Sequence, residues 1–521
     1  MYIKKTNPWL GILFVALNLF TTCAFSETTA VANTNPPSSY SEQVVSSPAE
    51  LPITKEPIAK EPITKNQGTP APSTEMLPAT PHSESLLTGM PAETKVTSAA
   101  VVAQTPAPSQ PYSVDFNKIN SGDTAWMLSA TALVLLMTIP GLVLFYAGMV
   151  RKKNVLSTAL QSFAVCCLVS VIWIFIGYSL AFTPGSTPYI GGLDRVMLSG
   201  LNYIKATSQL TVSHLAPTIP ESVFVMFQMT FAIITPALIV GAFAERMRFT
   251  AILIFMTLWS IFVYAPVAHW VWEPSGLFAS QGVLDFAGGT VVHINAGAAG
   301  LVCAYVLGSR SGYGKVPFIP YNLVYTLVGA SLLWVGWFGF NAGSAGAADG
   351  RAGMAMLVTQ AAAAIAALTW VSIEWLVKSR ITMLGFASGA VAGLVAITPA
   401  SGFVNISGAL AIGLAAGIFC YWGATGLKRL LGADDALDVF GIHGVGGLVG
   451  AILTGVFADK ALSGLDANVM MQVVAAFGTL IYSAVMTFII LMIVNILVGL
   501  RVDAEDEHDG LDLTQHAERI M

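Results

Sequence analysis

Eleven long apolar segments constrain the fold of this chain more than any other feature of its sequence. A helix needs about 17–25 mainly apolar residues to cross a bilayer, because lipid offers its backbone no hydrogen-bond partners. Segments of this kind lie at 126–149, 158–182, 222–243, 250–271, 290–308, 321–340, 353–376, 383–399, 403–425, 441–458 and 471–499. The sequence therefore predicts an all-α polytopic membrane protein with eleven transmembrane helices.

Composition supports this class and argues against several others. Of the 521 residues, 55% are hydrophobic and 10% are charged, whereas soluble domains carry about 25% charged residues. A formal net charge of −5 gives no reason to expect a nucleic-acid partner. The five cysteines form no C-x-x-C pair, and we find neither a phosphate-binding loop nor a nucleophile–base set. We therefore expect no metal, no cofactor and no enzymatic activity.

The N-terminal region has the composition of exported sequence. A basic start, the apolar run 9–20 and small residues near position 25 predict a signal peptide over 1–26. The alternatives are an uncleaved anchor and a lipoprotein signal that ends at Cys23. Residues 27–120 are rich in Pro, Ser and Thr, which predicts a disordered exported extension.

Basic residues predict the orientation of the helices. Loops after odd-numbered segments hold far more Lys and Arg residues than loops after even-numbered segments. Because cytoplasmic loops carry the excess of basic residues, odd-numbered segments should end in the cytoplasm. We expect a transmembrane domain at 121–500 in the cell (inner) membrane, with the N-terminus outside and a cytoplasmic tail at 501–521.

Two short echoes indicate an internal repeat of five segments. Segment one ends with the sequence FYAG at 145–148, and segment six ends with FNAG at 340–343. His293 in segment five and His443 in segment ten are each followed, four residues later, by glycine. A repeat with an odd number of spans inserts its second copy upside down, and substrate sites of such proteins lie near the bilayer midplane. The predicted architecture is a five-plus-five inverted repeat followed by a final long helix.

The two histidines are the strongest functional candidates. An ionisable side chain at bilayer depth costs roughly 2.5–3.5 kcal/mol on insertion scales, so it marks a functional site by default. A neutral imidazole both donates and accepts one hydrogen bond, which suits a small neutral hydrogen-bonding molecule in an apolar pore. The alternative is that each histidine only bonds a neighbouring helix.

Aromatic and acidic residues surround these segments. The rings of Phe227, Phe231, Trp272, Trp337 and Phe340 are typical of membrane interfaces, yet rings at a pore mouth also attract cations by about 0.5–2 kcal/mol each. Further candidates are Ser344, an acceptor oxygen, and Asp285 and Asp438, which precede segments five and ten. The alternatives are helix capping or a turn for Asp285 and a structural role for Asp438.

Four blocks of the sequence resemble signature motifs of a known family. They are FQMTFAIITPALIVGAFAERMRF at 227–249, DFAGGTVVHINAGAAGLVCAYVLGSR at 285–310, WVGWFGFNAGSAG at 334–346 and DDALDVFGIHGVGGLVG at 434–450. From about residue 123 to its C-terminus the chain is similar to the ammonium transporter (Amt/Mep/Rh) family, bacterial Amt type. The resemblance implies an eleven-helix protomer, a homotrimer with one pore per subunit, and ammonium or ammonia as the substrate.

The resemblance also implies roles for the candidate residues. They are an outer recruitment site of Phe227, Phe231, Trp272 and Ser344, a gate of Phe231 and Phe340, pore residues His293, His443 and Trp337, and the structural or electrostatic aspartates Asp285 and Asp438. Ammonium would lose its proton near the gate and pass the histidines as ammonia. The alternatives are an electroneutral gas channel of the Rh type and an ammonium sensor that acts through a PII-type partner.

The chain departs from the family pattern at three places. Residues 273–275 read Glu-Pro-Ser where some relatives have a shorter glycine-rich link, which leaves the shape and charge of the outer vestibule open. The segment 510–516 resembles the family's regulatory tail, but the residues after it differ. The N-terminal extension is no part of the family's core.

Overall fold

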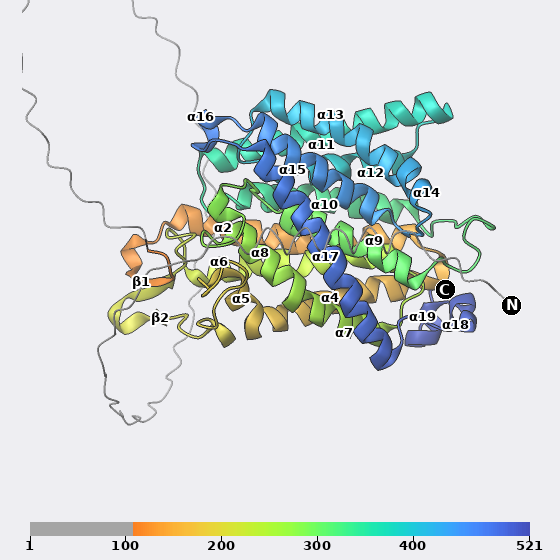
Figure 1. Cartoon of the computed structure of the whole chain (residues 1–521), viewed down its shortest axis with the longest axis horizontal. Helices are drawn as coiled ribbons and strands as arrows, with labels where there is room; N and C mark the ends of the chain where they lie inside the picture. The colour runs from red at the N-terminus through yellow and green to blue at the C-terminus, as the bar shows by residue number, and fades with distance from the viewer. Residues whose placement is uncertain (1–107) are drawn as a thin grey trace, which may run out of the picture. The chain divides into compact units, whose positions relative to one another are not determined.

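The computed structural model describes residues 108–521 (Figure 1). The predicted signal peptide and most of the predicted extension lie outside the described residues. Within them, ten helices are long and apolar enough to cross a membrane, and Met383–Ile397 is a shorter apolar helix of 15 residues. Together they account for the eleven predicted spans, so the all-α polytopic fold is confirmed.

Several spans consist of α-helices joined by a π-helical turn. The α-helices are α2 (Ser121–Leu136), α3 (Val143–Met149), α4 (Val155–Ile172), α5 (Tyr178–Phe182), α6 (Glu221–Phe243), α7 (Phe249–Trp259), α8 (Ala265–Trp272), α9 (Asn295–Leu307), α10 (Leu323–Gly343), α11 (Gly350–Lys378), α12 (Met383–Ile397), α13 (Ile406–Trp422), α14 (Lys428–Leu431), α15 (Val445–Phe457), α16 (Lys460–Ser463), α17 (Val469–Val498), α18 (Ala504–Asp509) and α19 (Leu511–His516). The π-helical turns are η2 (Met137–Leu142), η4 (Trp173–Gly177), η7 (Ser260–Tyr264), η9 (Gly289–Ile294), η10 (Gly423–Leu427) and η11 (Phe440–Gly444). Such turns often mark functional sites, and both candidate histidines lie in one.

Side-chain caps explain where two helices begin. The predicted first and ninth spans start at 126 and 403, whereas the helices start at Ser121 and Ile406. The Asn120 side chain accepts hydrogen bonds from the backbone N–H groups at the start of α2, and Asn405 accepts one from the first turn of α13. Hydropathy alone does not locate these caps, because they satisfy the backbone and not the apolar face.

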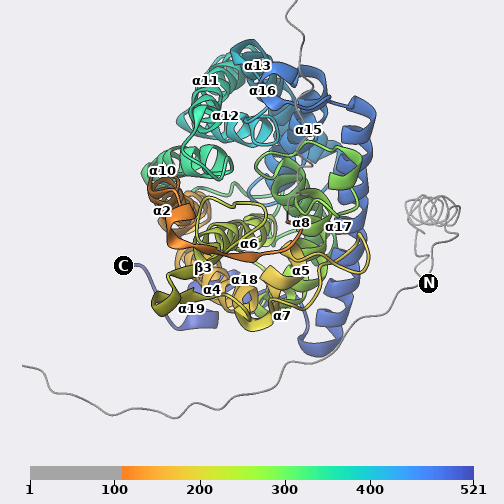
Figure 2. The same ribbon diagram turned by 90° about the vertical axis from the view of Figure 1, so that its left-hand side faces the viewer.

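A small antiparallel sheet lies at one end of the bundle, and α18 and α19 lie at the other (Figure 1). Figure 2 views the molecule from the sheet end. Its strands β1 (Tyr112–Asp115), β2 (Tyr203–Ile204) and β3 (Gln209–Val212) have the order β1-β3-β2. In the register, Tyr112 lies opposite Val212. The predicted disorder over 27–120 is therefore wrong from Tyr112 onward, because β1 pairs with β3, which lies in the loop after span two. Short 3-10 turns are η1 (Phe116–Lys118), η3 (Lys152–Asn154), η5 (Val196–Leu198), η6 (Lys205–Thr207) and η8 (Ala279–Gln281).

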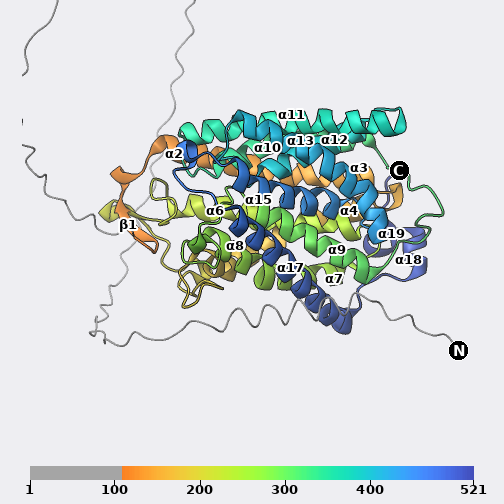
Figure 3. The same cartoon turned by 45° about the horizontal axis from the view of Figure 1, so that its top comes forward.

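Small residues let the helices approach closely. A methyl group on Gly393 of α12 would lie 2.5 Å from the carbonyl oxygen of Ala362 on α11, and one on Gly413 of α13 would meet the same oxygen at 2.5 Å. Lipid gives no hydrophobic force between helices, so close packing of this kind holds a membrane bundle together. The long helix α17 packs across α7, α9 and α15 and completes the bundle (Figure 3).

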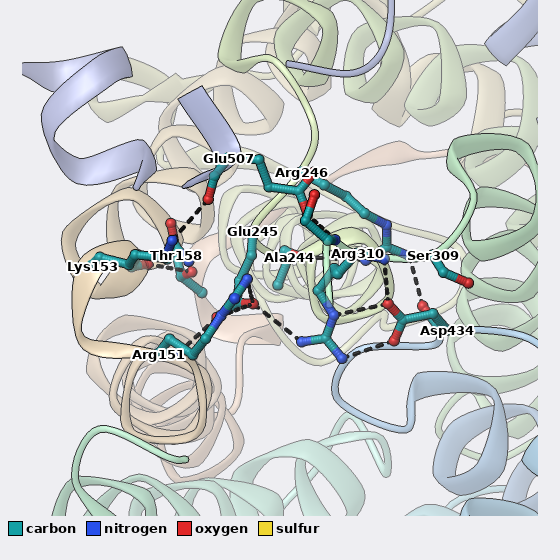
Figure 4. A network of polar contacts seen from close by, with 12 residues as sticks. Arg151, Lys153, Thr158, Ala244, Glu245, Arg246, Ser309, Arg310, Asp434 and Glu507 are labelled. Atoms are coloured by element: carbon teal, nitrogen blue, oxygen red, sulfur yellow. Dashed lines mark hydrogen bonds and ion pairs between the residues drawn. The ribbon is translucent and has the colours of Figure 1, made fainter. Parts of the chain in front are cut away.

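A buried ion-pair network joins the loops at the end opposite the sheet (Figure 4). Arg310 contacts Glu245 at 3.3 Å and Asp434 at 2.8 Å, and Arg151 contacts Glu245 at 2.7 Å. Burial raises the pKa of Glu245, but hydrogen bonds from Arg151 and the charge of Arg310 outweigh burial and lower the pKa below its ordinary value. These residues follow spans one, three, five and nine, so loops predicted to share one side of the membrane lie together.

The C-terminal tail packs against the same end. Glu507 of α18 accepts a hydrogen bond from the backbone N–H of Ser311 at 2.6 Å and forms an ion pair with Arg501 at 2.7 Å. Asp512 of α19 accepts a hydrogen bond from the backbone N–H of Ser157 at 2.7 Å, close to the start of α4. The tail is thus attached to the loops through polar contacts, together with Leu511 of α19, which is fully buried.

We predict that Arg310→Met destabilises the fold by about 3–5 kcal/mol, because it removes a buried guanidinium that pairs with Glu245 and Asp434. The matched control is Lys460→Met, which breaks a pair with Asp466 whose side chains are 68% and 81% exposed. An exposed pair contributes at most about 1 kcal/mol. Unfolding of both purified variants in detergent measures the difference, and equal stability of the two would contradict the role of the network.

Candidate functional site

The two candidate histidines face each other inside the bundle. His293 lies in η9 and His443 in η11, with 1% and 5% of their surface exposed. Their Nδ1 atoms are 3.3 Å apart, and their ring centroids are 5.3 Å apart. A hydrogen bond between two neutral rings needs one donor and one acceptor, so one ring carries its hydrogen at Nδ1 and the other at Nε2. The remaining Nε2 atoms therefore offer one N–H and one lone pair.

Glycines bring the two histidine helices into contact. A Cβ on Gly297, four residues after His293, would collide with the backbone of Gly444. A Cβ on Gly447, four residues after His443, would lie 3.0 Å from the backbone nitrogen of Ile294. Each glycine therefore packs against the residue that follows the other histidine, and a larger side chain at either position would separate the rings.

Asp285 caps the helix that carries His293. Its carboxylate accepts hydrogen bonds from the backbone N–H groups of Gly288, Gly289, Thr290 and Val291 at 2.7–3.2 Å. Burial raises the pKa of Asp285, although these four N–H groups oppose that shift. The capping role that the sequence left open is therefore what the geometry shows.

Asp435 has the corresponding place before the second histidine. It lies eight residues before His443, as Asp285 lies eight residues before His293. Its carboxylate accepts a hydrogen bond from the N–H of Phe440 at 2.7 Å, at the start of η11. Sequence reasoning missed Asp435, although the shared Asp–His spacing in the two halves is a signal that would have found it.

The structure gives Asp438 a different contact. Its carboxylate pairs with Lys428 at 2.7 Å, near the end of span nine. Burial raises the pKa of the neighbouring Asp435 to about 6, and the charge of Lys428 opposes that shift. Asp438 therefore lies in a charged cluster at the start of span ten and not against the histidine ring.

The predicted aromatic residues form one cluster toward the sheet end of the bundle. The ring of Phe231 lies 4.2 Å from that of Phe340, 5.0 Å from that of Phe227 and 5.6 Å from that of Trp272, measured between centroids. The hydroxyl of Ser344 donates to the carbonyl of Phe340 at 2.9 Å, so its oxygen keeps lone pairs for another partner. The four residues of the predicted outer site thus come from α6, α8 and the end of α10.

Two neighbours fix the orientation of Trp272. Its indole N–H donates to the backbone carbonyl of Asp285 at 2.9 Å, and its ring stacks on Phe182 at 6.3 Å. Sequence reasoning did not identify Phe182, because a phenylalanine at the end of an apolar span carries no distinguishing signal. Asp285 therefore orients Trp272 with its carbonyl and caps the His293 helix with its carboxylate.

Trp337 connects the aromatic cluster to the histidines. Its ring lies 5.5 Å from that of His293 and 5.4 Å from that of Phe340. Its N–H donates to the hydroxyl oxygen of Thr398 at 2.8 Å, so the indole presents its face and not its donor to the histidine. Thr398 was also missed from the sequence.

A narrow cavity, with room for about one water molecule, borders Phe340 and both imidazoles. Its other lining residues are Met137, Leu142, Phe145, Ile234, Leu238, Val292, Leu333, Trp337 and Val391. Since the Trp337 N–H is already bonded, the imidazoles supply the side-chain hydrogen-bonding groups of this cavity. Such a lining suits a small neutral molecule and gives a charge little compensation for its lost hydration. No cluster of metal-ligating residues occurs among residues 108–521.

Comparison with known proteins agrees with this geometry. The model of the Ammonium Transporter Family matches residues 125–520. A Bacillus subtilis ammonium transporter is 48% identical over 407 residues, which cover 76% of this chain and 98% of that protein. An Aquifex aeolicus ammonium transporter is 47% identical and covers 77% of this chain and 94% of its own length.

Solved structures give the same result. Saccharomyces cerevisiae Mep2 superposes with a TM-score of 0.69 at 35% identity, over 75% of this chain and 90% of its own. A structure titled Sensor Amt Protein has a TM-score of 0.69 at 27% identity, over 77% of this chain and 99% of its own. The match over most of the chain, on the fold described above, shows that this protein belongs to the ammonium transporter family.

Proposed function

We propose that this protein transports ammonium, which it captures at the outer aromatic cluster, deprotonates and conducts as ammonia past His293 and His443. The observation that carries the proposal is the imidazole pair in an otherwise apolar cavity. Relatives named as ammonium transporters support the choice of substrate. The proposal has three steps, and each rests on a different set of contacts.

Capture is the first step. A cation over an aromatic face gains about 0.5–2 kcal/mol. The ring centroid of Phe231 lies 5.0 Å from that of Phe227 and 5.6 Å from that of Trp272. The free lone pairs of Ser344 add an acceptor for an ammonium N–H. These contacts replace part of the hydration that ammonium loses at the mouth of the pore.

Deprotonation is the second step. An unpaired cation in an apolar interior loses far more hydration energy than aromatic contacts return. Phe231 contacts the outer rings, and Phe340, whose ring centroid lies 4.2 Å from that of Phe231, lines the cavity. Ammonium therefore gives up a proton to water at the pore mouth before it passes these two rings. Potassium has no proton to lose, and the same barrier therefore excludes it.

Conduction is the third step. Ammonia donates and accepts hydrogen bonds, and the histidine pair offers one N–H and one lone pair. The pair can thus bond ammonia in either orientation without taking a permanent charge. We further propose that the separated proton crosses as well, which would make transport electrogenic.

A current measurement separates the two transport modes. Addition of ammonium to proteoliposomes that contain the purified protein should produce a sustained inward current if the proton crosses. Flux of ammonia without any current would instead establish an electroneutral channel of the Rh type.

A sensor is the second candidate function, favoured by the likeness to a structure titled Sensor Amt Protein. A sensor would bind a cytoplasmic partner in response to ammonium and show negligible uptake. We propose that a PII-type protein is the partner in either case and that it contacts the tail and the loops around Arg151 and Arg310. Measured uptake together with partner binding distinguishes a regulated transporter from a sensor.

We also propose the assembly and membrane orientation that the sequence predicted. The subunits would form a homotrimer in the inner membrane, with the sheet outside and α18 and α19 in the cytoplasm. The inverted repeat is supported by the reciprocal packing of Gly297 and Gly447 and by the equal Asp–His spacing. The signal peptide at 1–26 and the export of the extension that precedes β1 stay predictions.

We predict that His293→Ala and His443→Ala each lower the ammonium-driven current by about tenfold or more. Each change removes one hydrogen bond in the pore, and an unsatisfied partner there costs about 1–3 kcal/mol. His508→Ala is the control, because that side chain is 87% exposed in the tail. Wild-type current and ion selectivity in both pore variants would refute the assigned pore.

We predict that Trp272→Leu raises the ammonium concentration needed for half-maximal transport by about twofold to thirtyfold, because one cation–π contact is lost. Maximal flux should change less, because the ring acts before the gate. The control Trp375→Leu alters a ring that is half exposed on α11. An unchanged KM in Trp272→Leu would exclude the ring from ammonium capture.

A further inference from the structure

A buried glutamine of α17 holds the segment that joins the two parts of the candidate site. Gln472 lies near the start of α17 and is 2% exposed. Its side-chain oxygen accepts a hydrogen bond from the backbone N–H of Leu284 at 2.7 Å, and its side-chain nitrogen donates to the backbone carbonyl of the same residue at 2.7 Å. Since Leu284 directly precedes Asp285, Gln472 fixes the backbone one residue before the cap of the His293 helix.

The same side chain also contacts the span of the second histidine. Its nitrogen donates a further hydrogen bond to the backbone carbonyl of Ala451 at 3.1 Å. Ala451 lies on α15, eight residues after His443. A Cβ on Gly455 of this helix would lie 3.0 Å from Cγ of Gln472, so the glycine lets α17 approach. Gln472 therefore joins span eleven both to the segment before span five and to span ten.

The three partners of Gln472 match the hydrogen-bonding groups of a carboxamide. A backbone N–H can only donate and a carbonyl can only accept, so the side chain must supply one acceptor and two donors. These partners also fix which end of the amide is oxygen and which is nitrogen. Gln472 belongs neither to the aromatic cluster nor to the lining of the cavity, and the three steps of transport do not use it.

Asp285 connects the held segment to both parts of the site. Its carbonyl accepts the indole N–H of Trp272 at 2.9 Å, and its carboxylate caps η9, which carries His293. On the other side, the N–H of Phe286 donates to the carbonyl of Pro399, at the end of α12, at 3.0 Å. The segment is therefore held between span eight and span eleven. A shift of its backbone would move Trp272 and the start of η9 together.

The second half of the chain holds the corresponding position in a similar way. Asp434 precedes Asp435, as Leu284 precedes Asp285. The backbone carbonyl of Asp434 accepts a hydrogen bond from the guanidinium of Arg246 at 2.6 Å, and Arg246 is fully buried. In both halves, a buried side chain from elsewhere in the chain thus fixes the residue before the capping aspartate. This recurrence argues that the position needs a fixed backbone.

We propose that Gln472 is a positioning residue of the ammonium capture site. It acts through Leu284 and Asp285, which keep the Trp272 ring in the orientation that receives the cation. It touches neither the ring nor the substrate. This inference rests on the proposed transport function and adds to its first step a residue from span eleven, which lies outside the five-plus-five repeat.

Gln472→Met separates hydrogen bonding from packing. Methionine has a similar volume and adapts its shape to its neighbours, but it cannot donate to the carbonyls or replace the amide oxygen. If Gln472 only filled space, the variant would keep the wild-type KM for ammonium. A positioning residue should behave differently, because a small misplacement of a binding group weakens its interaction. We expect KM to rise about threefold or more.

The transport test uses the full-length protein in proteoliposomes, with saturable ammonium uptake as the readout. The double variant Gln472→Met with Trp272→Leu should have nearly the KM of Trp272→Leu alone, because the position of an absent ring no longer matters. Thr487→Val is the matched control. It removes a buried hydrogen bond of 3.1 Å between α17 and Trp259, and it should keep the wild-type KM.

Hydrogen exchange gives a second readout that does not depend on transport. In Gln472→Met, the backbone N–H groups of Leu284 and of residues 288–291 should exchange about tenfold faster, since one group loses its acceptor and the others lose a fixed cap. Thr487→Val should leave the exchange of these amides unchanged. Mass spectrometry of peptides that cover residues 284–291 measures both variants.

Three results would overturn the inference. They are a wild-type KM in Gln472→Met, effects on KM that multiply fully in the double variant, and faster exchange at 284–291 in Thr487→Val to the same extent. Failure of the capture proposal itself looks different, because Trp272→Leu would then keep the wild-type KM. In that case the exchange measurement would still show whether Gln472 holds the segment, but the segment would have no role in capture.

Discussion

The apolar lining at the centre of the bundle is the constraint on which the other features of this structure depend. In such an interior, each polar group must find its partner within the protein or be left at a cost of several kcal/mol. The structure meets this demand by pairing the groups locally. His293 bonds His443, Trp337 bonds Thr398, and Asp285 satisfies four backbone N–H groups. What stays unpaired in the cavity is the hydrogen-bonding capacity of two imidazole nitrogens.

The hydrogen bond between His293 and His443 requires that their helices lie very close together. This requirement explains the glycines of these helices better than a general preference for small residues does. Gly297 and Gly447 each occupy the place where a side chain would collide with the backbone beside the other histidine. The distance between the imidazoles is therefore set by backbone contact and not by flexible side chains. A pore built in this way has a width that neighbouring side chains cannot easily change, because protein interiors are close-packed.

The sequence predicted the features that depend on long apolar runs and on local repetition. Eleven spans followed from hydropathy, and the echo around His293 and His443 identified these residues as the strongest functional candidates. The sequence did not predict β1, because a strand of four residues depends on a partner about a hundred residues away. Asp435 was missed although its spacing from His443 equals that of Asp285 from His293. Phe182 and Thr398 carry no signal in the sequence that marks them as functional. Their importance lies in which ring each one contacts, and only the tertiary structure determines that.

The two ends of the bundle solve different electrostatic problems. At the tail end, Arg310 is matched to Glu245 and Asp434, so buried charges cancel and hold the loops together. At the sheet end, the rings of the aromatic cluster carry no formal charge. If the protein transports ammonium as proposed, this difference in charge between the two ends follows from the transport steps. A site that must capture a cation and then release it as a neutral molecule needs a weak attraction, because a fixed ion pair would hold ammonium at the mouth and prevent the loss of its proton.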